Sequence, residues 1–223
     1  MSPSPAELFA AALDRRRLYL RAEDRSRREL PLERWLGPLD RADAGVLDRA
    51  VGPVLDVGCG PGRHVLALAR RSVLALGVDV TPAAVRYARA RGAPVFRGSV
   101  FAAVPGVGHW RTSLLLDQNI GIGGRPVVLL ERLRTLLRAD GSVLCELDPP
   151  GSPTRSELIA LEDASGLRSA WFAWARVSVD GVEPLAHRAR MSVREIWHDD
   201  GRWFAALAAA HHTVSNSSCT ASA

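Results

Sequence analysis

The chain has 223 residues, of which 47% are hydrophobic and 24% are charged. This length and composition are typical of a globular protein with one sizeable core, or at most two small ones, and they exclude a disordered or fibrous chain. The formal net charge is +5, and all 29 basic residues are arginine because the chain contains no lysine. Acidic residues are interspersed among the arginines, which favours a solvated surface over a nucleic-acid-binding segment.

Features of membrane, secreted and metal-binding proteins are absent from the sequence. No stretch approaches the roughly 18 apolar residues that cross a bilayer. At the N-terminus, Glu7 interrupts the apolar stretch and the arginines follow it, which is unlike a secretory signal. Cysteines 59, 145 and 219 lie far apart, without CxxC or Cys/His spacing, so we expect neither a disulfide framework nor a zinc site. The sequence therefore predicts a cytoplasmic protein with no membrane partner.

The first 50 residues are predicted to form a helical and extended cap on a larger domain. The apolar spacing predicts a helix over residues 6–17, an extended segment over 18–24 and two short helices within 32–50. The first strong strand begins after this segment. We therefore expect the main domain to span residues 51–208.

From Val54 onwards, apolar strands alternate with amphipathic helices. The strands are expected at residues 53–57, 73–80, 93–98, 112–118 and 142–148, and the helices at 63–71, 81–92 and 125–141. Strands that alternate with helices of this length predict parallel βαβ units with helices on both faces of the sheet. The fold class expected from this pattern is α/β.

The pattern changes after Gly151. Residues 156–177 are expected to form an inserted hairpin around Ser165-Gly166, and 182–191 a helix. Two strands within 192–208 are joined by Asp200-Gly201, a strong signal for a type I′ hairpin. Residues 209–223 are small and polar, which predicts a disordered tail.

Three glycines follow the first predicted strand at every second position, in VLDVGCGPGRHV (residues 54–65). A tight turn between strand and helix needs one glycine and rarely three. Glycines at this spacing let the backbone turn sharply and approach a ligand, whose polar groups can meet the N–H groups of the following helix. The segment therefore predicts a ligand-binding loop.

Two phosphate-binding motifs do not fit this loop. A dinucleotide fingerprint read from Gly58 needs glycine or alanine at position 63, where the chain has Arg63, and a P-loop needs a lysine. Asp56, two residues before the first glycine, favours a positively charged ligand group over a pyrophosphate. Asp79 ends the second strand, where a carboxylate can accept both hydroxyls of a ribose. Alternatively, Asp79 is an acid that precedes the helix starting at Thr81-Pro82.

In chain order, several segments resemble the motifs of class I S-adenosylmethionine-dependent methyltransferases. They are DVGCGPG (56–62), GVD (77–79), LLD (115–117) and RADGSVLCE (138–146). The resemblance covers about residues 53–148. Within this family, the chain more narrowly resembles small bacterial, actinomycete-type enzymes. It implies a Rossmann-like three-layer sandwich whose seven-stranded, mostly parallel sheet contains one antiparallel strand. It also implies S-adenosyl-L-methionine as the cofactor, with the helix and strand pair of residues 182–208 closing the sheet.

The resemblance implies that the glycine loop holds the methionine half of the cofactor. The loop residues are Gly58, Cys59, Gly60, Pro61 and Gly62. Asp56 would be oriented towards the amino group of the cofactor.

The resemblance also implies contacts to the nucleoside half of the cofactor. Asp79 would hold the ribose hydroxyls, with Val80 against the adenine. Members of the family usually have an acid or amide after the third strand to bind the adenine amine, whereas this chain has Ser99, which offers a hydroxyl, and Val100, which offers its backbone. Asp117, at the end of the fourth strand, would line the pocket beside the methyl group.

No catalytic residue follows from the sequence. Because the sulfonium methyl group is already activated, alignment of the reactants can supply about 7–11 kcal/mol of barrier reduction without a side-chain catalyst. An oxygen nucleophile would need a general base, for which Asp117, His109 and Glu146 are weak candidates that can each be structural instead. Gln118 and Asn119 either present donors at the methyl site or belong to a flexible connection.

Together these features predict a methyltransferase that uses S-adenosylmethionine to methylate a small molecule by in-line transfer. Three alternatives remain open: a nucleic-acid methyltransferase, which a pI of about 10.0 allows, a non-catalytic protein of the same fold, and an NAD-type oxidoreductase, which Arg63 disfavours. A nucleic-acid partner is not expected, because no RNA-binding module is present. The aromatic residues Trp171, Phe172 and Trp174 either cover an apolar substrate or form a satellite core.

Overall fold

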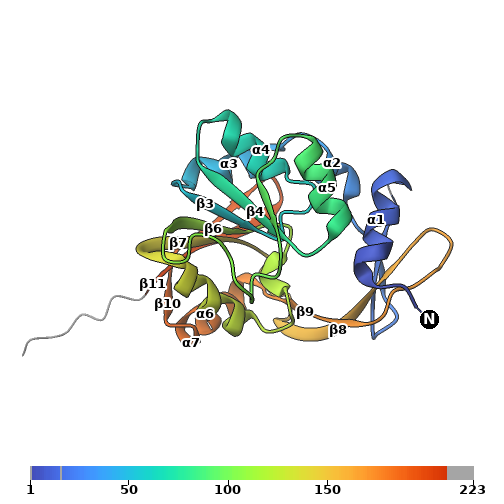
Figure 1. Cartoon of the computed structure of the whole chain (residues 1–223). Coiled ribbons are helices and arrows are strands. Elements are labelled where there is room, and N and C mark those ends of the chain that lie inside the picture. Colours follow the sequence, from blue (N-terminus) through green and yellow to red (C-terminus); the bar gives the residue numbers. More distant parts are fainter. Residues whose placement is uncertain (1, 16, 210–223) are drawn as a thin grey trace, which may run out of the picture.

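The chain folds into two sheets flanked by helices, and the computed structural model describes residues 2–15 and 17–209 (Figure 1). In chain order the helices are α1 (Pro5–Arg15), α2 (Leu32–Leu36), α3 (Arg41–Arg49), α4 (Arg63–Arg70), α5 (Pro82–Ala90), α6 (Pro126–Leu136) and α7 (Val179–Arg188), with a 3-10 turn η1 (Asn119–Gly121). The strands are β1 (Tyr19–Ala22), β2 (Arg27–Glu29), β3 (Val54–Val57), β4 (Ala75–Asp79), β5 (Val95–Arg97), β6 (Trp110–Leu115), β7 (Leu137–Leu147), β8 (Arg155–Glu162), β9 (Phe172–Arg176), β10 (Met191–Asp199) and β11 (Arg202–Ala209). Among the described residues, no helix is both long and apolar enough to cross a bilayer.

The larger sheet has seven strands in the order β10-β11-β7-β6-β3-β4-β5. β3 pairs in parallel with β4 and β6, and β7 pairs in parallel with β6. β11 is antiparallel to both of its neighbours, so it alone runs against the other strands. This topology confirms the predicted α/β fold with one antiparallel strand.

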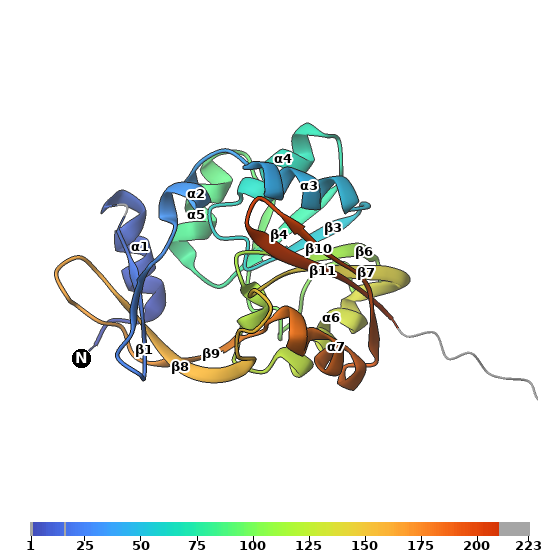
Figure 2. The ribbon, with the colours of Figure 1, turned by 180° about the vertical axis from the view of Figure 1, so that it is seen from behind.

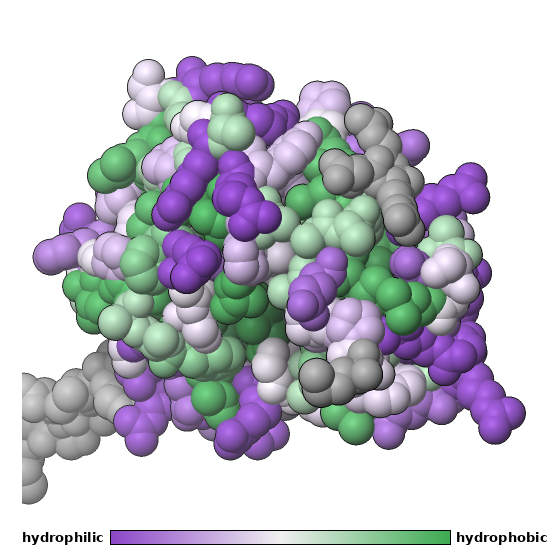
Figure 3. All heavy atoms as spheres, turned by 45° about the vertical axis from the view of Figure 1, so that its right-hand side comes forward, coloured by the Kyte–Doolittle hydropathy of each residue, from purple (hydrophilic) through white to green (hydrophobic). Residues whose placement is uncertain are grey.

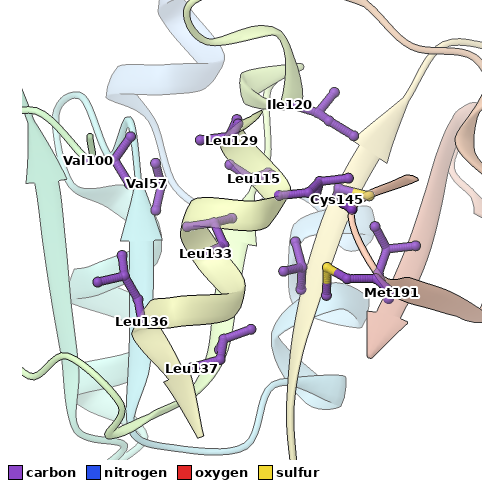
Figure 4. Packing of buried hydrophobic residues seen from close by; sticks show 14 of the residues in the cluster. Val57, Val100, Leu115, Ile120, Leu129, Leu133, Leu136, Leu137, Cys145 and Met191 are labelled. Atoms are coloured by element: carbon purple, nitrogen blue, oxygen red, sulfur yellow. The ribbon is translucent and has the colours of Figure 1, made fainter. Parts of the chain in front are cut away.

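Helices cover both faces of this sheet because its central strands are apolar on both sides. All four residues of β3 are buried. On one face α3, α4 and α5 form a core with the sheet, and on the other face α6 and α7 form a second core. Figure 4 shows the second core, in which Leu129, Leu133 and Leu136 of α6 lie against Leu115 and Cys145 of the sheet.

The structure corrects two predicted boundaries and confirms the last hairpin. The helix predicted over residues 125–141 ends at Leu136, because residues 137–141 belong to β7. The hairpin predicted at Asp200-Gly201 is confirmed, since both residues have the positive φ angles (48° and 75°) that a type I′ turn requires. Ala209 ends β11 and so is not part of a disordered tail, and residues 210–223 lie outside the described residues.

The smaller sheet joins the cap to the hairpin that follows β7. Its order is β2-β1-β8-β9, and all its strands pair antiparallel, for example through Leu20 opposite Leu161 and Ala22 opposite Ile159. Figure 2 shows β1, β8 and α1 side by side, beyond the end of the larger sheet. The predicted cap and the predicted inserted hairpin are therefore one structural unit, and not two separate additions.

The predicted boundary at residue 50 also changes. Ala42, Val46 and Leu47 of α3 are buried in the core formed with α4 and α5, so α3 belongs to the main domain. Leu8 and Ala12 of α1 pack in a separate cluster that includes Leu32 and Leu161. The part of the chain that acts as a cap thus ends near α2.

Candidate functional site

A cavity of about 560 Å³ lies between the carboxyl edge of the larger sheet and the cap. Its floor is made by the loops that follow β3, β4, β5 and β6, and its cover by α1, α2 and the smaller sheet. In an α/β sheet, ligands bind at this edge. The face of the molecule that carries the cap shows a hydrophobic recess bordered by hydrophilic side chains (Figure 3).

The glycine loop after β3 lines this cavity through residues 58–61. Gly58 and Gly60 have φ angles of 72° and 50°, in the left-handed region that favours glycine. A methyl group on Gly58 would lie 2.6 Å from the side-chain nitrogen of Asn119. No atom lies within 4 Å of the position that a methyl group on Gly60 would take, so this part of the loop leaves room for a ligand.

Gly62 does not line the cavity, although it belongs to the predicted binding loop. It is buried, and a methyl group at this position would lie 3.0 and 3.1 Å from the Cβ atoms of Ala88 and Ala93. Gly62 therefore permits close packing of the start of α4 against α5. The structure thus assigns Gly62 a packing role, whereas the sequence predicted a ligand contact.

Cys59 lines the cavity but is not a reactive thiol. Burial, together with the carboxylates of Asp56 and Asp79, raises the pKa of Cys59 well above its ordinary value. Its side chain packs where a methyl group on Gly77 would lie. Cys59 therefore fixes the loop against β4, and the protonated thiol has little nucleophilic character.

Asp79 lies at the end of β4, as predicted, and its carboxylate accepts two backbone N–H groups. Gly60 donates to one oxygen at 2.9 Å and Thr81 to the other at 2.7 Å. Burial raises the pKa of Asp79, and these two hydrogen bonds oppose the rise. No described arginine lies within salt-bridge distance of this carboxylate.

Asp56 is 1% exposed, and its Oδ2 atom has no hydrogen-bond partner among the described residues. The His64 ring lies beside it, with Nδ1 3.6 Å from Oδ2. An unpartnered buried carboxylate oxygen is costly. A ligand that supplied a positively charged donor would remove this cost.

Asp117 and Glu146 are neutralised by arginines. Arg63 donates to both oxygens of Asp117 at 3.0 and 2.9 Å, and Arg34 donates to one of them at 2.8 Å. Arg202 donates to both oxygens of Glu146 at 3.0 and 2.7 Å. Burial alone would raise the pKa of Asp117, but Arg63, His64 and Arg34 outweigh it, so the pKa of Asp117 is lowered.

Arg63 and Arg202 extend this network to α3. Both donate to Asp43, which is fully buried, and His64 lies beside the same carboxylate. The neutralising groups thus come from α2, α4 and β11, which lie far apart in the sequence. A carboxylate that is held by arginines in this way is a weak general base.

The amide pair after β6 holds the loops in place. The Asn119 amide donates to the carbonyl oxygens of Val57 and Gly58, both at 3.0 Å. The Gln118 amide donates to Asp148 at 3.0 Å, and the Gln118 side chain lines the cavity. Asp117 and Gln118 both have positive φ angles (54° and 63°), a strained backbone of the kind found at binding sites.

The segments after β4 and β5 form another wall of the cavity. Val80, Ser99 and Val100 all line it. The Ser99 hydroxyl accepts the N–H of Phe101 at 3.2 Å, and the Val100 carbonyl accepts from Arg132 at 2.9 Å. The N–H group of Val100 donates to no described residue.

His109 does not reach the cavity. It is exposed and lies just before β6, at the amino end of a parallel strand, whereas the cavity is at the carboxyl ends. The structure therefore contradicts its candidacy as a general base.

Several cavity residues had no motif in the sequence. Arg28, Arg34, Trp35 and Phe9 come from the cap, and His64 and Arg63 come from α4. Of the late aromatic residues, Phe172 and Trp174 line the cavity, whereas Trp171 is exposed and does not. Trp171, just before β9, and Phe172, its first residue, are separated as predicted. Phe172 reaches the cap because β9 pairs with β8 and β8 pairs with β1.

Residues 54–103 match the family model of a methyltransferase domain. None of the curated proteins matches the chain in sequence. The matched segment contains β3, β4 and β5 with the glycine loop and Asp79.

Solved structures with the same fold include several methyltransferases. An S-adenosylmethionine-dependent methyltransferase from Bacteroides fragilis, in complex with S-adenosyl-L-homocysteine, is 21% identical, with a TM-score of 0.76 over 94% of this chain and 96% of its own. The CcbJ methyltransferase from Streptomyces caelestis is 14% identical, with a TM-score of 0.61 over 79% of this chain and 92% of its own. The sugar N-methyltransferase KedS8 from Streptoalloteichus is 17% identical, with a TM-score of 0.55 over 76% of this chain and 85% of its own.

These comparisons agree with the resemblance found in the sequence. The segment that carries the loop matches the family model of a methyltransferase domain, and the fold is shared with solved S-adenosylmethionine-dependent methyltransferases. Because the Bacteroides match covers 94% of this chain, the similarity includes most of the cap.

We predict that Asp117→Asn destabilises the protein by about 3 kcal/mol at pH 7, because Arg63 would lose one of its two ionised partners in a buried site and Arg34 would lose its partner as well. The folded pKa of Asp117 lies below its ordinary value of 3.8, so its contribution is present above pH 3.8 and is lost as the pH falls through the folded pKa. Urea unfolding of both proteins between pH 7 and pH 3 measures the difference.

The matched control is Asp48→Asn, which removes an exposed carboxylate that pairs with Arg71. Its effect should stay within about 0.5 kcal/mol. A difference for Asp117→Asn that is equally small, or that does not decrease below pH 3.8, would contradict the assigned ion pair.

Proposed function

We propose that this protein is a methyltransferase that uses S-adenosylmethionine to methylate a small molecule held in the cavity. The observation that carries the proposal is the unequal treatment of four carboxylates at one edge of the sheet. Arginines neutralise Asp117 and Glu146, whereas Asp56 and Asp79 receive none. S-adenosylmethionine offers what these two carboxylates lack, namely an ammonium group and two adjacent ribose hydroxyls.

The residues present fit this cofactor. We propose that Asp56, whose Oδ2 has no hydrogen-bond partner, receives the ammonium group, and that the open side of Gly60 accommodates the methionine half. Asp79 would accept the ribose hydroxyls in addition to its two backbone donors. Val80 would contact the adenine. The N–H group of Val100 would donate a hydrogen bond to a ring nitrogen of the adenine. Ser99 would contribute its hydroxyl at the same wall.

The chain's own residues would act by positioning. When bound, S-adenosylmethionine would supply an activated sulfonium methyl group for in-line transfer to a lone pair of the acceptor, with S-adenosylhomocysteine as the leaving group. Asn119 and Asp79 hold the glycine loop in place. The cap covers the cavity and would orient the acceptor, an effect that can supply several kcal/mol of barrier reduction. Asp117 and Glu146, fixed by arginines, would shape the electrostatic environment and not remove a proton.

The cover over the cavity favours a small-molecule acceptor. The floor of the site faces α1, α2 and the smaller sheet, which bound a cavity of about 560 Å³, a volume typical of a small-molecule site. Among the structural neighbours, one is a sugar N-methyltransferase and another, from Burkholderia thailandensis, is bound to 1,6-didemethyltoxoflavin. We retain the cytoplasm as the proposed location.

Arg63 argues against a dinucleotide cofactor. In a dinucleotide fingerprint this position is small, whereas here the guanidinium is buried and paired with Asp43 and Asp117. A pyrophosphate would also lie beside the Asp56 carboxylate, and the two negative charges would repel each other.

A label-transfer experiment tests the proposal. The protein is incubated with S-adenosylmethionine that carries a ¹³C-labelled methyl group, together with either an extract of bacterial metabolites or purified bacterial RNA and DNA. We expect mass spectrometry to find the label in a compound of low mass and not in nucleic acid. Label in the nucleic acid alone would overturn the choice of acceptor.

We predict that Asp79→Ala weakens the binding of S-adenosylhomocysteine at least about tenfold, because it removes the charged acceptor for the ribose hydroxyls. In a thermal-shift titration, ligand at 100 times Kd stabilises a protein by about 2.7 kcal/mol, and at least about half of this stabilisation should be lost in the variant. Asp48→Ala, which removes an exposed acid, serves as the control. Equal ligand-induced shifts in both variants would exclude Asp79 from the binding site.

A further inference from the structure

One face of the smaller sheet lines the cavity described above and a second, smaller cavity beside it. Strand residues that alternate along the chain and pair across the sheet share a face. Paired positions include Leu20 with Arg28, Ile159 with Phe172, Glu157 with Trp174 and Arg155 with Arg176. All eight of these side chains line one of two neighbouring cavities, so they belong to a single face.

This face is apolar at one end. Ile159, Leu161 and Phe172 line the large cavity together with Phe9 and Trp35 from the cap helices. The rings of Phe172 and Trp174 meet edge to face, with centroids 6.2 Å apart. A surface of this kind binds flat apolar groups.

The other end of the face is basic and lines a second cavity of about 230 Å³. The two cavities adjoin, since Leu20, Arg28, Gln118 and Trp174 line both. Arginines 28, 155 and 176 line the second cavity, and Glu157 is the acidic residue among its lining residues.

Two of these three arginines already have carboxylate partners. Arg155 pairs with Glu157 at 2.9 Å and Arg176 with Asp148 at 2.8 Å. Arg28 pairs with no carboxylate in the part of the chain that the structure describes, and it has one long hydrogen bond of 3.4 Å to the Gln118 oxygen. Burial and the nearby Arg176 lower the pKa of Arg28, and the carboxylates of Asp148 and Glu157, which form no salt bridge with it, oppose this shift.

From this arrangement, and resting on the proposed function, we infer that the methyl acceptor is an organic acid with a flat apolar body. The body lies against Phe172, Trp174 and Ile159, and the anionic group binds Arg28 where the two cavities meet. A guanidinium forms paired, charge-assisted hydrogen bonds with a carboxylate or phosphate, which makes it selective for such groups. Arg34 does not serve this role, because it is bound to Asp117.

The test compares acids with their uncharged counterparts. Wild-type protein saturated with S-adenosylhomocysteine is titrated by ligand-observed NMR with indole-3-acetate and indole-3-acetamide, with 4-hydroxybenzoate and 4-hydroxybenzamide, and with phenyl phosphate and phenol. We expect the acid of at least one pair to bind at least about tenfold more tightly than its neutral counterpart. The carboxylate and phosphate pairs show which anion is preferred. Equal or undetectable binding within every pair would overturn the inference.

Two variants of neighbouring residues on β2 test whether the preference for acids depends on Arg28. Arg28→Gln should weaken the preferred acid at least about tenfold and change its neutral counterpart by less than twofold. Arg27→Gln removes the same charge from the opposite face of β2, where Arg27 pairs with Glu162, and Glu162 keeps Arg21 and Arg168 as partners. It should leave both affinities within twofold. Equal effects of the two variants would contradict a specific role for Arg28.

The outcomes also separate this inference from the proposed function. If S-adenosylhomocysteine binds but no acid is preferred, only the acceptor class is wrong. If S-adenosylhomocysteine does not bind, the proposed function fails, and the preference for acids is then measured on the free protein. Thermal melting of both variants checks that they fold. The comparison of acids with their neutral counterparts uses wild-type protein and does not depend on the variants.

Discussion

Four carboxylates gathered at one edge of a parallel sheet are the constraint on which this structure depends. Parallel strands place their carboxyl ends together, so Asp56, Asp79, Asp117 and Glu146 converge on one cavity. Buried like charges are costly unless they are compensated. The chain compensates Asp117 and Glu146 with arginines and leaves Asp56 and Asp79 to backbone donors and His64. This difference separates the residues that build the site from those that are available to a ligand.

The ion pairs that compensate these carboxylates also connect distant parts of the chain. Arg34 comes from the cap, Arg63 from the helix after the glycine loop and Arg202 from the last strand, and all three converge on the same few carboxylates. The cap strands extend this connection, because they pair with the hairpin after β7 and cover the cavity. The proposed cofactor contacts and the proposed acceptor contacts therefore lie on opposite walls, the former on the edge of the larger sheet and the latter on the smaller sheet.

The features that the sequence predicted well are those with a local signal. The alternation of apolar strands with helices predicted the larger sheet, and Asp200-Gly201 predicted the last hairpin. The pairing of β1 with β8 has no local signal, because it joins segments far apart in the chain. The sequence could not distinguish the packing role of Gly62 from the open, ligand-facing position of Gly60, since this difference arises only where α4 packs against α5. Arg63 excluded one motif in the sequence, but its partners are brought to it only by the fold.

The most direct test of the cofactor assignment is calorimetric titration of the purified protein with S-adenosylmethionine, S-adenosylhomocysteine and NAD. Asp56 and Asp79 should favour a ligand with an ammonium group and a ribose, and Asp56 should repel a pyrophosphate. We therefore predict micromolar binding of the first two compounds and none of NAD. Binding of NAD, or binding of neither sulfur compound by protein shown to be folded, would contradict the assignment.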